Sequence, residues 1–167
     1  MARRAAIGGV FAALAMIFSY VESLIPFHFG VPGIKLGLAN LVIVTGLYLL
    51  RIPDLCLVAL IRIVVSGLLF GNIYSLIYSL AGGACSLLIM LLLKKTGKFS
   101  VYSISIAGGV FHNLGQIAAA AAVTRIPVLL YYLPVLMGAG MITGALIGVI
   151  ASRVLKIFFH SSKQFLH

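Results

Sequence analysis

Residues 73–93 read IYSLIYSLAGGACSLLIMLLL, a run of 21 residues without a charged side chain. A helix needs about 20 mostly apolar residues to cross the hydrocarbon core of a bilayer, which is about 30 Å thick. Lys94, Lys95 and Lys98 follow directly and give the run a polar end. This stretch therefore predicts a membrane-spanning helix.

Apolar runs of similar character lie on both sides of this stretch, separated by Pro, Gly and charged residues. We expect the other spans at about 5–25, 35–50, 53–70, 101–123 and 128–158, with a possible break near Pro134 in the last. The chain is thus predicted to be an all-α integral membrane protein of about six helices, forming a single transmembrane domain over residues 1–167. The N-terminal run could pass for a signal peptide, but no convincing cleavage site follows it, so we expect it to remain as a helix.

The composition of the chain supports the same class. Hydrophobic residues make up 63% of it and charged residues only 8%. A soluble domain of this size and composition would expose large apolar patches, so lipid is the solvent that it fits. A net charge of +10 would suggest nucleic-acid binding in a soluble protein, but the cations lie mainly at the ends of apolar runs. We therefore expect no nucleic-acid partner.

The same cations predict the orientation of the chain. If both termini lie on one side, that side carries nine of the twelve Lys and Arg residues: Arg3, Arg4, Arg51, Lys94, Lys95, Lys98, Arg153, Lys156 and Lys163. Cytoplasmic loops of membrane proteins carry an excess of Lys and Arg. Both termini are therefore expected in the cytoplasm.

Polar side chains within the spans are few, and each is a candidate functional residue because it is costly to place in lipid. His112, Asn113 and Gln116 share one face of the fifth expected helix. Arg62 lies near the middle of the third, where it needs an anionic partner or a watery cavity, and Glu22 is the only acidic residue on the outer side. These residues could form a ligand site, or they could form interhelical hydrogen bonds and a Glu22–Arg62 ion pair.

Further polar residues gather toward the outer side of the expected bundle: Lys35, Asn40, Asn72 and Arg125. Three cations, Arg62 among them, stand there against one carboxylate, so this half is net positive and favours an anionic ligand such as a phosphate or carboxylate. Tyr74 and Tyr78, four residues apart, could stack on a ring or mark the membrane interface.

The chain lacks the residue sets of common catalytic sites. Its two acidic residues, Glu22 and Asp54, are expected on opposite sides of the membrane, so they can form neither a carboxylate pair nor an aspartate-rich magnesium site. The sequence shows no Ser-His-Asp set, P-loop or metal-ligand cluster either. We therefore expect no catalysis by this chain alone, no metal and no cofactor.

Small residues recur every four positions in the first and sixth expected helices: Ala5, Gly9 and Ala13, then Gly140, Gly144, Gly148 and Ser152. Such stripes let helix backbones approach closely in lipid. Packing within the chain is the simpler interpretation of both stripes, and docking onto another subunit is the alternative.

Several segments together carry a resemblance to a known family. The run Pro32-Gly33-Ile34-Lys35-Leu36-Gly37-Leu38-Ala39-Asn40 is fairly specific, and it occurs with residues 22–26, Arg62, Gly82-Gly83 and residues 112–116. Through these segments the chain resembles the family described as heptaprenyl diphosphate synthase component I, also called Gx transporters. That family is similar to the substrate-binding S components of energy-coupling factor (ECF) transporters.

The resemblance implies an S-component-like bundle in the cytoplasmic membrane of a bacterium, which captures a vitamin or related solute and docks on a shared transmembrane coupling subunit that carries two ATPases. It also implies that the first small-residue stripe, Ala5, Gly9 and Ala13, contacts the shared subunit. We expect a small anionic, vitamin-like or isoprenoid- or flavin-related substrate, bound by Glu22, Lys35, Asn40, Arg62, Asn72, His112, Asn113 and Gln116. The alternatives are a membrane accessory subunit of a polyprenyl diphosphate synthase and an ion-coupled transporter.

Overall fold

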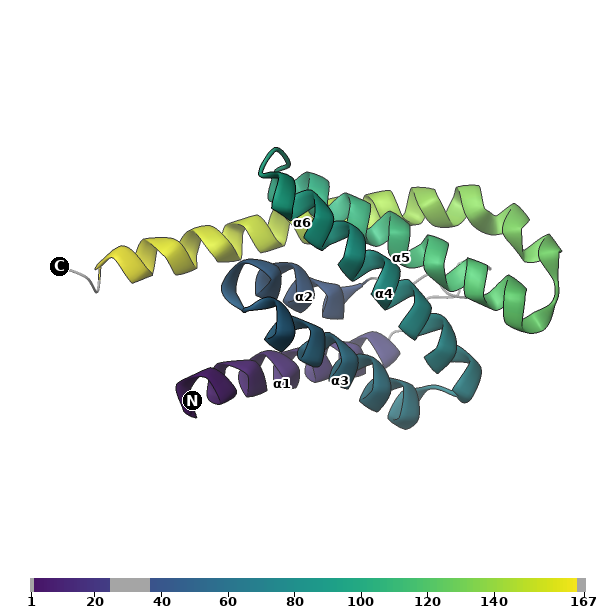
Figure 1. The fold of residues 1–167 in the computed structure, drawn as a ribbon, viewed down its shortest axis with the longest axis horizontal. Coiled ribbons are helices and arrows are strands. Elements are labelled where there is room, and N and C mark those ends of the chain that lie inside the picture. The colour runs from purple at the N-terminus through teal and green to yellow at the C-terminus, as the bar shows by residue number, and fades with distance from the viewer. Residues whose placement is uncertain (1, 25–36, 165–167) are drawn as a thin grey trace.

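The computed structural model describes residues 2–24 and 37–164. These residues form helices joined by short connections (Figure 1). In chain order the elements are α1 (Ala2–Leu24), α2 (Leu38–Leu49), α3 (Ile52–Phe70), α4 (Ile73–Thr96), α5 (Val101–Thr124), the short 3₁₀ helix η1 (Pro127–Tyr132) and α6 (Leu133–Gln164). The described part of the chain contains no strand, which confirms the predicted all-α class.

Five helical stretches in the described part are long and apolar enough to cross a membrane: α1, α3, α4, α5 and the stretch from η1 into α6. The predicted break near Pro134 is present, because η1 gives way to α6 at Leu133. The chain is therefore a multi-pass membrane protein.

The second expected span was predicted too long. α2 has 12 residues, and at about 1.5 Å per residue it covers only about 18 Å, well short of the hydrocarbon core. Its start is fixed by Gly37, whose φ of 73° is left-handed and cannot continue a right-handed helix. Residues 35 and 36, where the span was expected to begin, lie outside the described residues.

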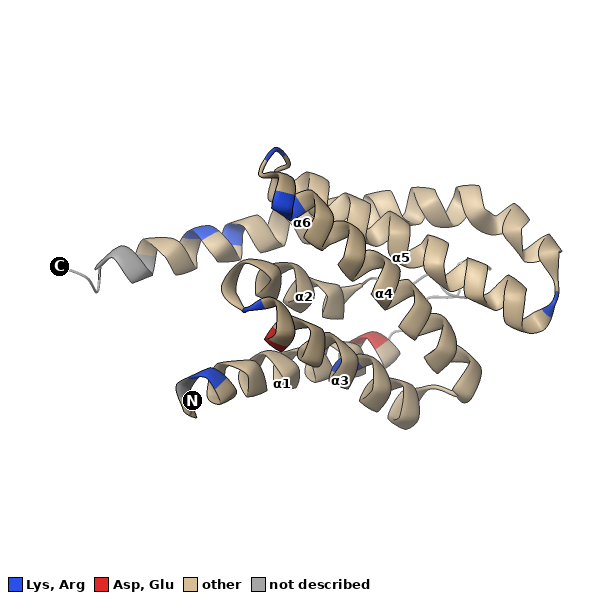
Figure 2. Cartoon of the chain, viewed as in Figure 1, with Lys and Arg blue, Asp and Glu red and all other residues tan. Residues whose placement is uncertain are grey.

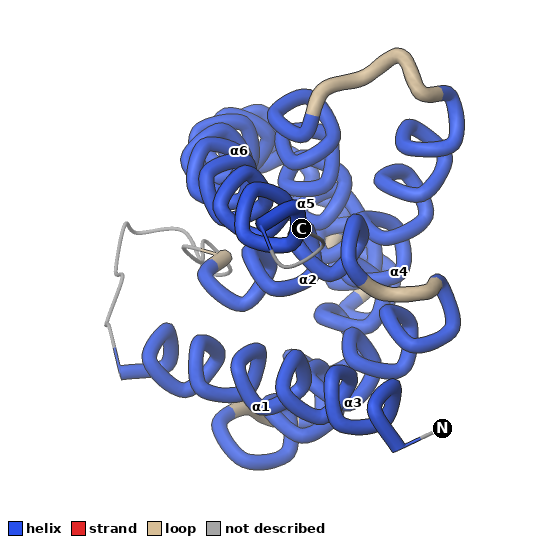
Figure 3. Tube along the Cα trace, turned by 90° about the vertical axis from the view of Figure 1, so that its left-hand side faces the viewer, coloured by secondary structure: helices blue, strands red, loops and turns tan. Residues whose placement is uncertain are grey.

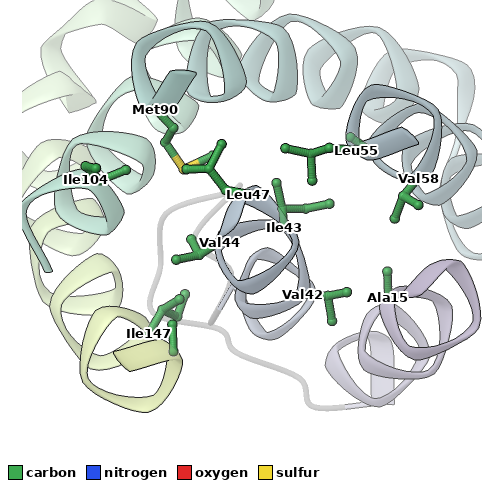
Figure 4. Packing of buried hydrophobic residues seen from close by; sticks show 12 residues of the cluster. Ala15, Val42, Ile43, Val44, Leu47, Leu55, Val58, Met90, Ile104 and Ile147 are labelled. Carbon is green, nitrogen blue, oxygen red and sulfur yellow. The ribbon is translucent and has the colours of Figure 1, made fainter. Parts of the chain in front are cut away.

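This short helix forms the centre of the bundle. α1 and α3 lie on one side of it and α5 and α6 on the other (Figure 3). Its buried side chains meet residues from the surrounding helices, such as Leu55 of α3, Met90 of α4 and Ile147 of α6 (Figure 4). A helix that is apolar on all sides is stable only where protein or lipid surrounds it completely, which explains why α2 carries so little polarity.

The close packing of α5 against α6 depends on glycine. A Cβ added at Gly140 would lie 2.8 Å from the carbonyl oxygen of Gly109, and one added at Gly144 would lie 2.7 Å from the Cα of Ile106. The Ser105 hydroxyl donates to the Gly144 carbonyl at 2.7 Å across this contact. The simpler interpretation of the small-residue stripe in α6, packing within the chain, is thus confirmed.

Most Lys and Arg residues of the described part lie toward the end of the molecule where α1 begins and α6 ends (Figure 2). Arg125 follows the last residue of α5. The positive-inside rule predicts that the first end is cytoplasmic, and we call the opposite half of the bundle the outer half. There Arg4 of α1 donates to both carboxylate oxygens of Asp54 of α3, from Nε at 2.6 Å and from Nη2 at 2.9 Å. Lys94 donates to the Leu47 carbonyl and lies 5.1 Å from the centre of the Tyr48 ring.

Candidate ligand-binding site

A cavity of about 310 Å³ lies inside the outer half of the bundle, and we call it the polar cavity. It collects side chains from six helices, α1 to α6. Six of the eight predicted binding residues line it: Glu22, Asn40, Arg62, His112, Asn113 and Gln116. The structure thus brings together residues that lie up to about ninety positions apart in the sequence, while their role in binding stays a prediction.

Arg62 is the cationic side chain that lines the polar cavity, which the Glu22 carboxylate also lines. It lies near the middle of α3, and its Nε is buried without a hydrogen-bond partner among the described residues. A buried guanidinium donor without an acceptor is unfavourable, because the lost hydration is not replaced. An anionic group in the polar cavity would supply the missing acceptor.

The expected ion pair between Glu22 and Arg62 is not formed in the described part of the chain, where Arg4–Asp54 is the ion pair present. Instead Glu22 Oε1 accepts a hydrogen bond of 2.5 Å from the backbone amide of Gly37. The first amides of a helix have no partner within the helix, and its dipole favours a carboxylate at that end. Glu22 therefore anchors the end of α1 to the start of α2. It still lines the same cavity as Arg62, without a direct salt bridge to it in the described part of the chain.

His112 and Gln116 reach the polar cavity because α4 and α5 approach closely behind them. A Cβ at Gly82 would lie 2.6 Å from Gln116 Cγ and 2.6 Å from the His112 carbonyl oxygen, and one at Gly115 would lie 2.8 Å from the Ala81 carbonyl oxygen. These glycines seat the two polar side chains against α4. For Gln116, no hydrogen bond is formed with the described residues.

Asn113 forms an interhelical hydrogen bond and also lines the candidate ligand site, the two alternatives that the sequence offered for it. Its Nδ2 donates to the Leu136 carbonyl at 2.7 Å, which is the interhelical hydrogen bond that one interpretation predicted. It also lines the polar cavity. Asn113 thus holds α5 to the start of α6 and fixes one wall of the cavity.

Two predicted residues are not placed in the polar cavity. Asn72 caps α4: its side chain accepts from the Ser75 amide at 2.8 Å, and the Ser75 hydroxyl accepts from the Asn72 amide at 2.9 Å. This reciprocal capping box gives Asn72 a structural role. Lys35 lies outside the described residues. Arg125, expected on the same side, ends α5 with a left-handed φ of 57° and does not line the polar cavity.

Several lining residues were missed because their sequence signal is weak. They are mainly hydroxyl side chains: Ser19, Ser23, Ser66, Ser75, Ser79 and Thr143. Ser and Thr occur often in spanning helices because they can bond to the backbone of the preceding turn, as Thr143 does to the Ala139 carbonyl at 2.9 Å. Their presence alone therefore does not distinguish a cavity from a lipid-facing surface.

A second cavity, of about 570 Å³, adjoins the first between α4, α5, η1 and α6, and we call it the apolar cavity. This cavity was not predicted from the sequence, because one of its walls is the short helix η1, whose residues were expected to begin the sixth span. Asn72 lines it together with the two tyrosines noted in the sequence, Tyr74 and Tyr78.

The side chains that line the polar cavity are of types that bind ligands through hydrogen bonds and charge. Among the described residues, no group of three or more His, Cys, Asp or Glu side chains could hold a metal ion. The polar cavity offers a guanidinium, an imidazole, amides and hydroxyls, which are suited to orienting an anion.

The fold and the cavity together define a multi-pass membrane protein that encloses a polar, arginine-containing cavity. A family model described as heptaprenyl diphosphate synthase component I matches residues 11–154. The chain belongs to this family, and the matched range contains all the residues that line the polar cavity. No curated protein and no solved structure matches the chain.

Proposed function

We propose that the chain is the solute-capturing membrane subunit of a transporter, working as the S components of ECF transporters do. It binds a small anionic molecule in the polar cavity from the outer side. The observation that carries this proposal is the buried Arg62 Nε, which has no hydrogen-bond partner among the described residues and belongs to a cavity lined by further polar side chains. A site for an anion explains why this donor is retained there.

The energy for release comes from partners in this proposal, because the chain carries no ATPase motif of its own. Ala5, Gly9 and Ala13 are exposed on α1, and a Cβ added at Gly9 would meet no atom within 4 Å. An unoccupied stripe of small residues supports the proposal that α1 docks on a shared transmembrane coupling subunit, which in turn carries the ATPases.

The family description favours a second candidate. A protein described as one component of heptaprenyl diphosphate synthase suggests a membrane accessory subunit that assists a soluble prenyltransferase and captures no solute. The two candidates predict different partners for the same chain.

Purification of the tagged protein from its native membrane in mild detergent separates these candidates. The transporter predicts co-purification of a second multi-pass membrane protein and of ATPases, identified by mass spectrometry. Recovery of a prenyltransferase without ATPases would overturn it in favour of the accessory subunit. Uptake of solute by the reconstituted chain alone in a proton or sodium gradient would overturn both.

A further inference from the structure

The apolar cavity has the size of a ligand site. Its volume of about 570 Å³ lies within the range of about 300–1,000 Å³ that is typical of small-molecule pockets. Its lining includes residues from the start of α4 and from the end of α5. The volume of the apolar cavity does not identify its ligand, but the chemical character of its lining residues indicates the kind of ligand that it suits.

Those walls differ sharply from the walls of the polar cavity. The residues special to the apolar cavity are mainly aliphatic and aromatic, and they include Ile117, Ala120, Leu129 and Tyr132. In the described part of the chain, the apolar cavity has no charged lining residue, whereas the polar cavity has Arg62 and Glu22. Each cavity therefore suits a different chemical group.

The two cavities share four lining residues, Ser75, Ser79, Asn113 and Gln116, so they meet along one boundary between α4 and α5. This boundary is held in place, since Asn113 Nδ2 donates to the Leu136 carbonyl at 2.7 Å. Gly82 leaves the space that the Gln116 side chain occupies, because a Cβ there would lie 2.6 Å from Gln116 Cγ. The two cavities are therefore adjacent, and these four side chains line both of them.

We propose that the two cavities form one site for an amphipathic anion, with its anionic head at Arg62 and its apolar chain between α4, α5 and η1. This inference rests on the proposed function and adds the substrate class. A purely polar anion would leave the apolar cavity filled only by water, which its walls do not favour. A neutral apolar molecule would leave the buried Arg62 donor without an acceptor.

The position of Arg62 argues against an ordinary membrane phospholipid as the occupant. The phosphate of a bilayer lipid lies at the membrane surface, outside the hydrocarbon core. Arg62 lies near the middle of the 19-residue helix α3, about half the membrane thickness from that surface. The head group that reaches Arg62 must therefore enter the bundle, which suits a free single-chain molecule.

A ladder of probes with one head and increasing chain length tests this inference. Inorganic diphosphate, isopentenyl diphosphate, geranyl diphosphate and farnesyl diphosphate are titrated into the purified full-length protein by isothermal titration calorimetry. Burial of one methylene corresponds to on the order of fourfold in affinity. Even partial burial of a five-carbon unit thus predicts binding at least about tenfold tighter from isopentenyl to geranyl diphosphate.

Two variants of one helix locate the chain. Ala120→Leu narrows the apolar cavity and is expected to remove the gain from geranyl over isopentenyl diphosphate while it preserves binding of the short probe. Ala118→Leu is the matched control, because Ala118 is exposed and lines neither cavity. If Ala120→Leu does not fold, Leu129→Ala, which removes contacts to the chain, is expected to weaken geranyl but not isopentenyl diphosphate.

The outcomes separate this inference from the proposed function. Two results would overturn the inference but not the anion site. In the first, all diphosphate probes bind with the same affinity whatever the length of their chain. In the second, Ala120→Leu and Ala118→Leu both keep the increase in affinity with chain length. A ladder in which no member binds the wild-type protein would overturn the inference and the anion site of the proposed function together. If uncharged farnesol binds as tightly as farnesyl diphosphate, the assignment of the anionic head to Arg62 would be overturned.

Discussion

Arg62 and Glu22 show how a residue's neighbours decide its role in this bundle. Both were expected in the outer half, and a carboxylate beside a guanidinium is the simplest way to neutralise both. In the structure the Glu22 carboxylate accepts from the Gly37 amide at the start of α2, and the Arg62 Nε has no acceptor among the described residues. The first arrangement stabilises the fold, and the second supports the proposed anion site.

Replacing Glu22 tests its anchoring role. Glu22→Gln removes the negative charge at the N-terminal end of α2, and we expect it to lower the free energy of unfolding by about 1 kcal/mol. Thermal unfolding of the detergent-solubilised protein measures the change. Ser23→Ala is the control, because the neighbouring exposed hydroxyl bonds only to the Tyr20 carbonyl of its own helix. Equal stability of Glu22→Gln and the wild type would contradict the anchor.

At the scale of the element, glycine decides which helices touch. The Gly140–Gly144–Gly148 stripe of α6 packs on α5, and Gly82 and Gly115 bring α4 against α5, so α5 carries its polar face between two closely packed neighbours. In the α1 stripe, a Cβ added at Gly9 would meet no atom of the described residues within 4 Å. The same sequence pattern therefore has two structural outcomes, and only the packing of each helix distinguishes them.

Two glycines of α6 predict effects of opposite sign. A Cβ at Gly144 would lie 2.7 Å from the Ile106 Cα, so Gly144→Ala should force the helices apart and lower stability by about 1–3 kcal/mol. A Cβ at Gly138 would meet no atom within 4 Å, so Gly138→Ala should raise stability by about 0.5–1 kcal/mol through its better helix propensity. Thermal unfolding of the two variants compares them, and a shift in the same direction for both would contradict this packing.

The α1 stripe gives a prediction about assembly. Gly9→Leu is expected to leave the chain folded, because nothing lies within 4 Å of the new Cβ, but to reduce co-purification of the coupling subunit by about tenfold. Gly8→Leu is the matched control, since its Cβ also meets no atom within 4 Å and points about 100° away around the helix. Unchanged recovery of partners with Gly9→Leu would place the docking surface elsewhere.

For the whole molecule, the asymmetry of charge predicts how the chain sits in the membrane. In Cys-free protein, with Cys56 and Cys85 replaced by Ala, a single Cys is introduced at Lys98, just before α5, or at Arg125, just after it. A membrane-impermeant maleimide should label position 125 in intact cells and position 98 only after permeabilisation. The reverse pattern would invert the orientation and place the polar cavity on the cytoplasmic side.

Much of this architecture follows from the sequence, because a bilayer requires long apolar helices with polar ends. The ends of α3, α4 and α5 lie within a few residues of the positions expected. The length of α2 was not predictable, since it depends on the left-handed backbone of Gly37 and on burial by the other helices.

The site was predictable in part for the same physical reason. Strongly polar residues are rare in apolar helices, so Arg62 and His112 could be predicted as candidate site residues from the sequence alone. The hydroxyls of the polar cavity and the whole apolar cavity were not apparent, because serine, alanine and leucine look alike in a cavity wall and in a lipid-facing surface. The partner of the Glu22 carboxylate depends on the approach of two helix ends, which sequence spacing does not encode.

The central claim is that the polar cavity around Arg62 holds an anionic molecule. Mass spectrometry of the small molecules that remain bound after gentle purification from the native membrane tests it most directly, with Arg62→Gln as the variant and Arg51→Gln, at the exposed start of α3, as the control. The account predicts one anionic molecule retained near one per chain by the wild type and by Arg51→Gln, and lost from Arg62→Gln. Full occupancy in Arg62→Gln, or no retained anion in the wild type, would contradict it.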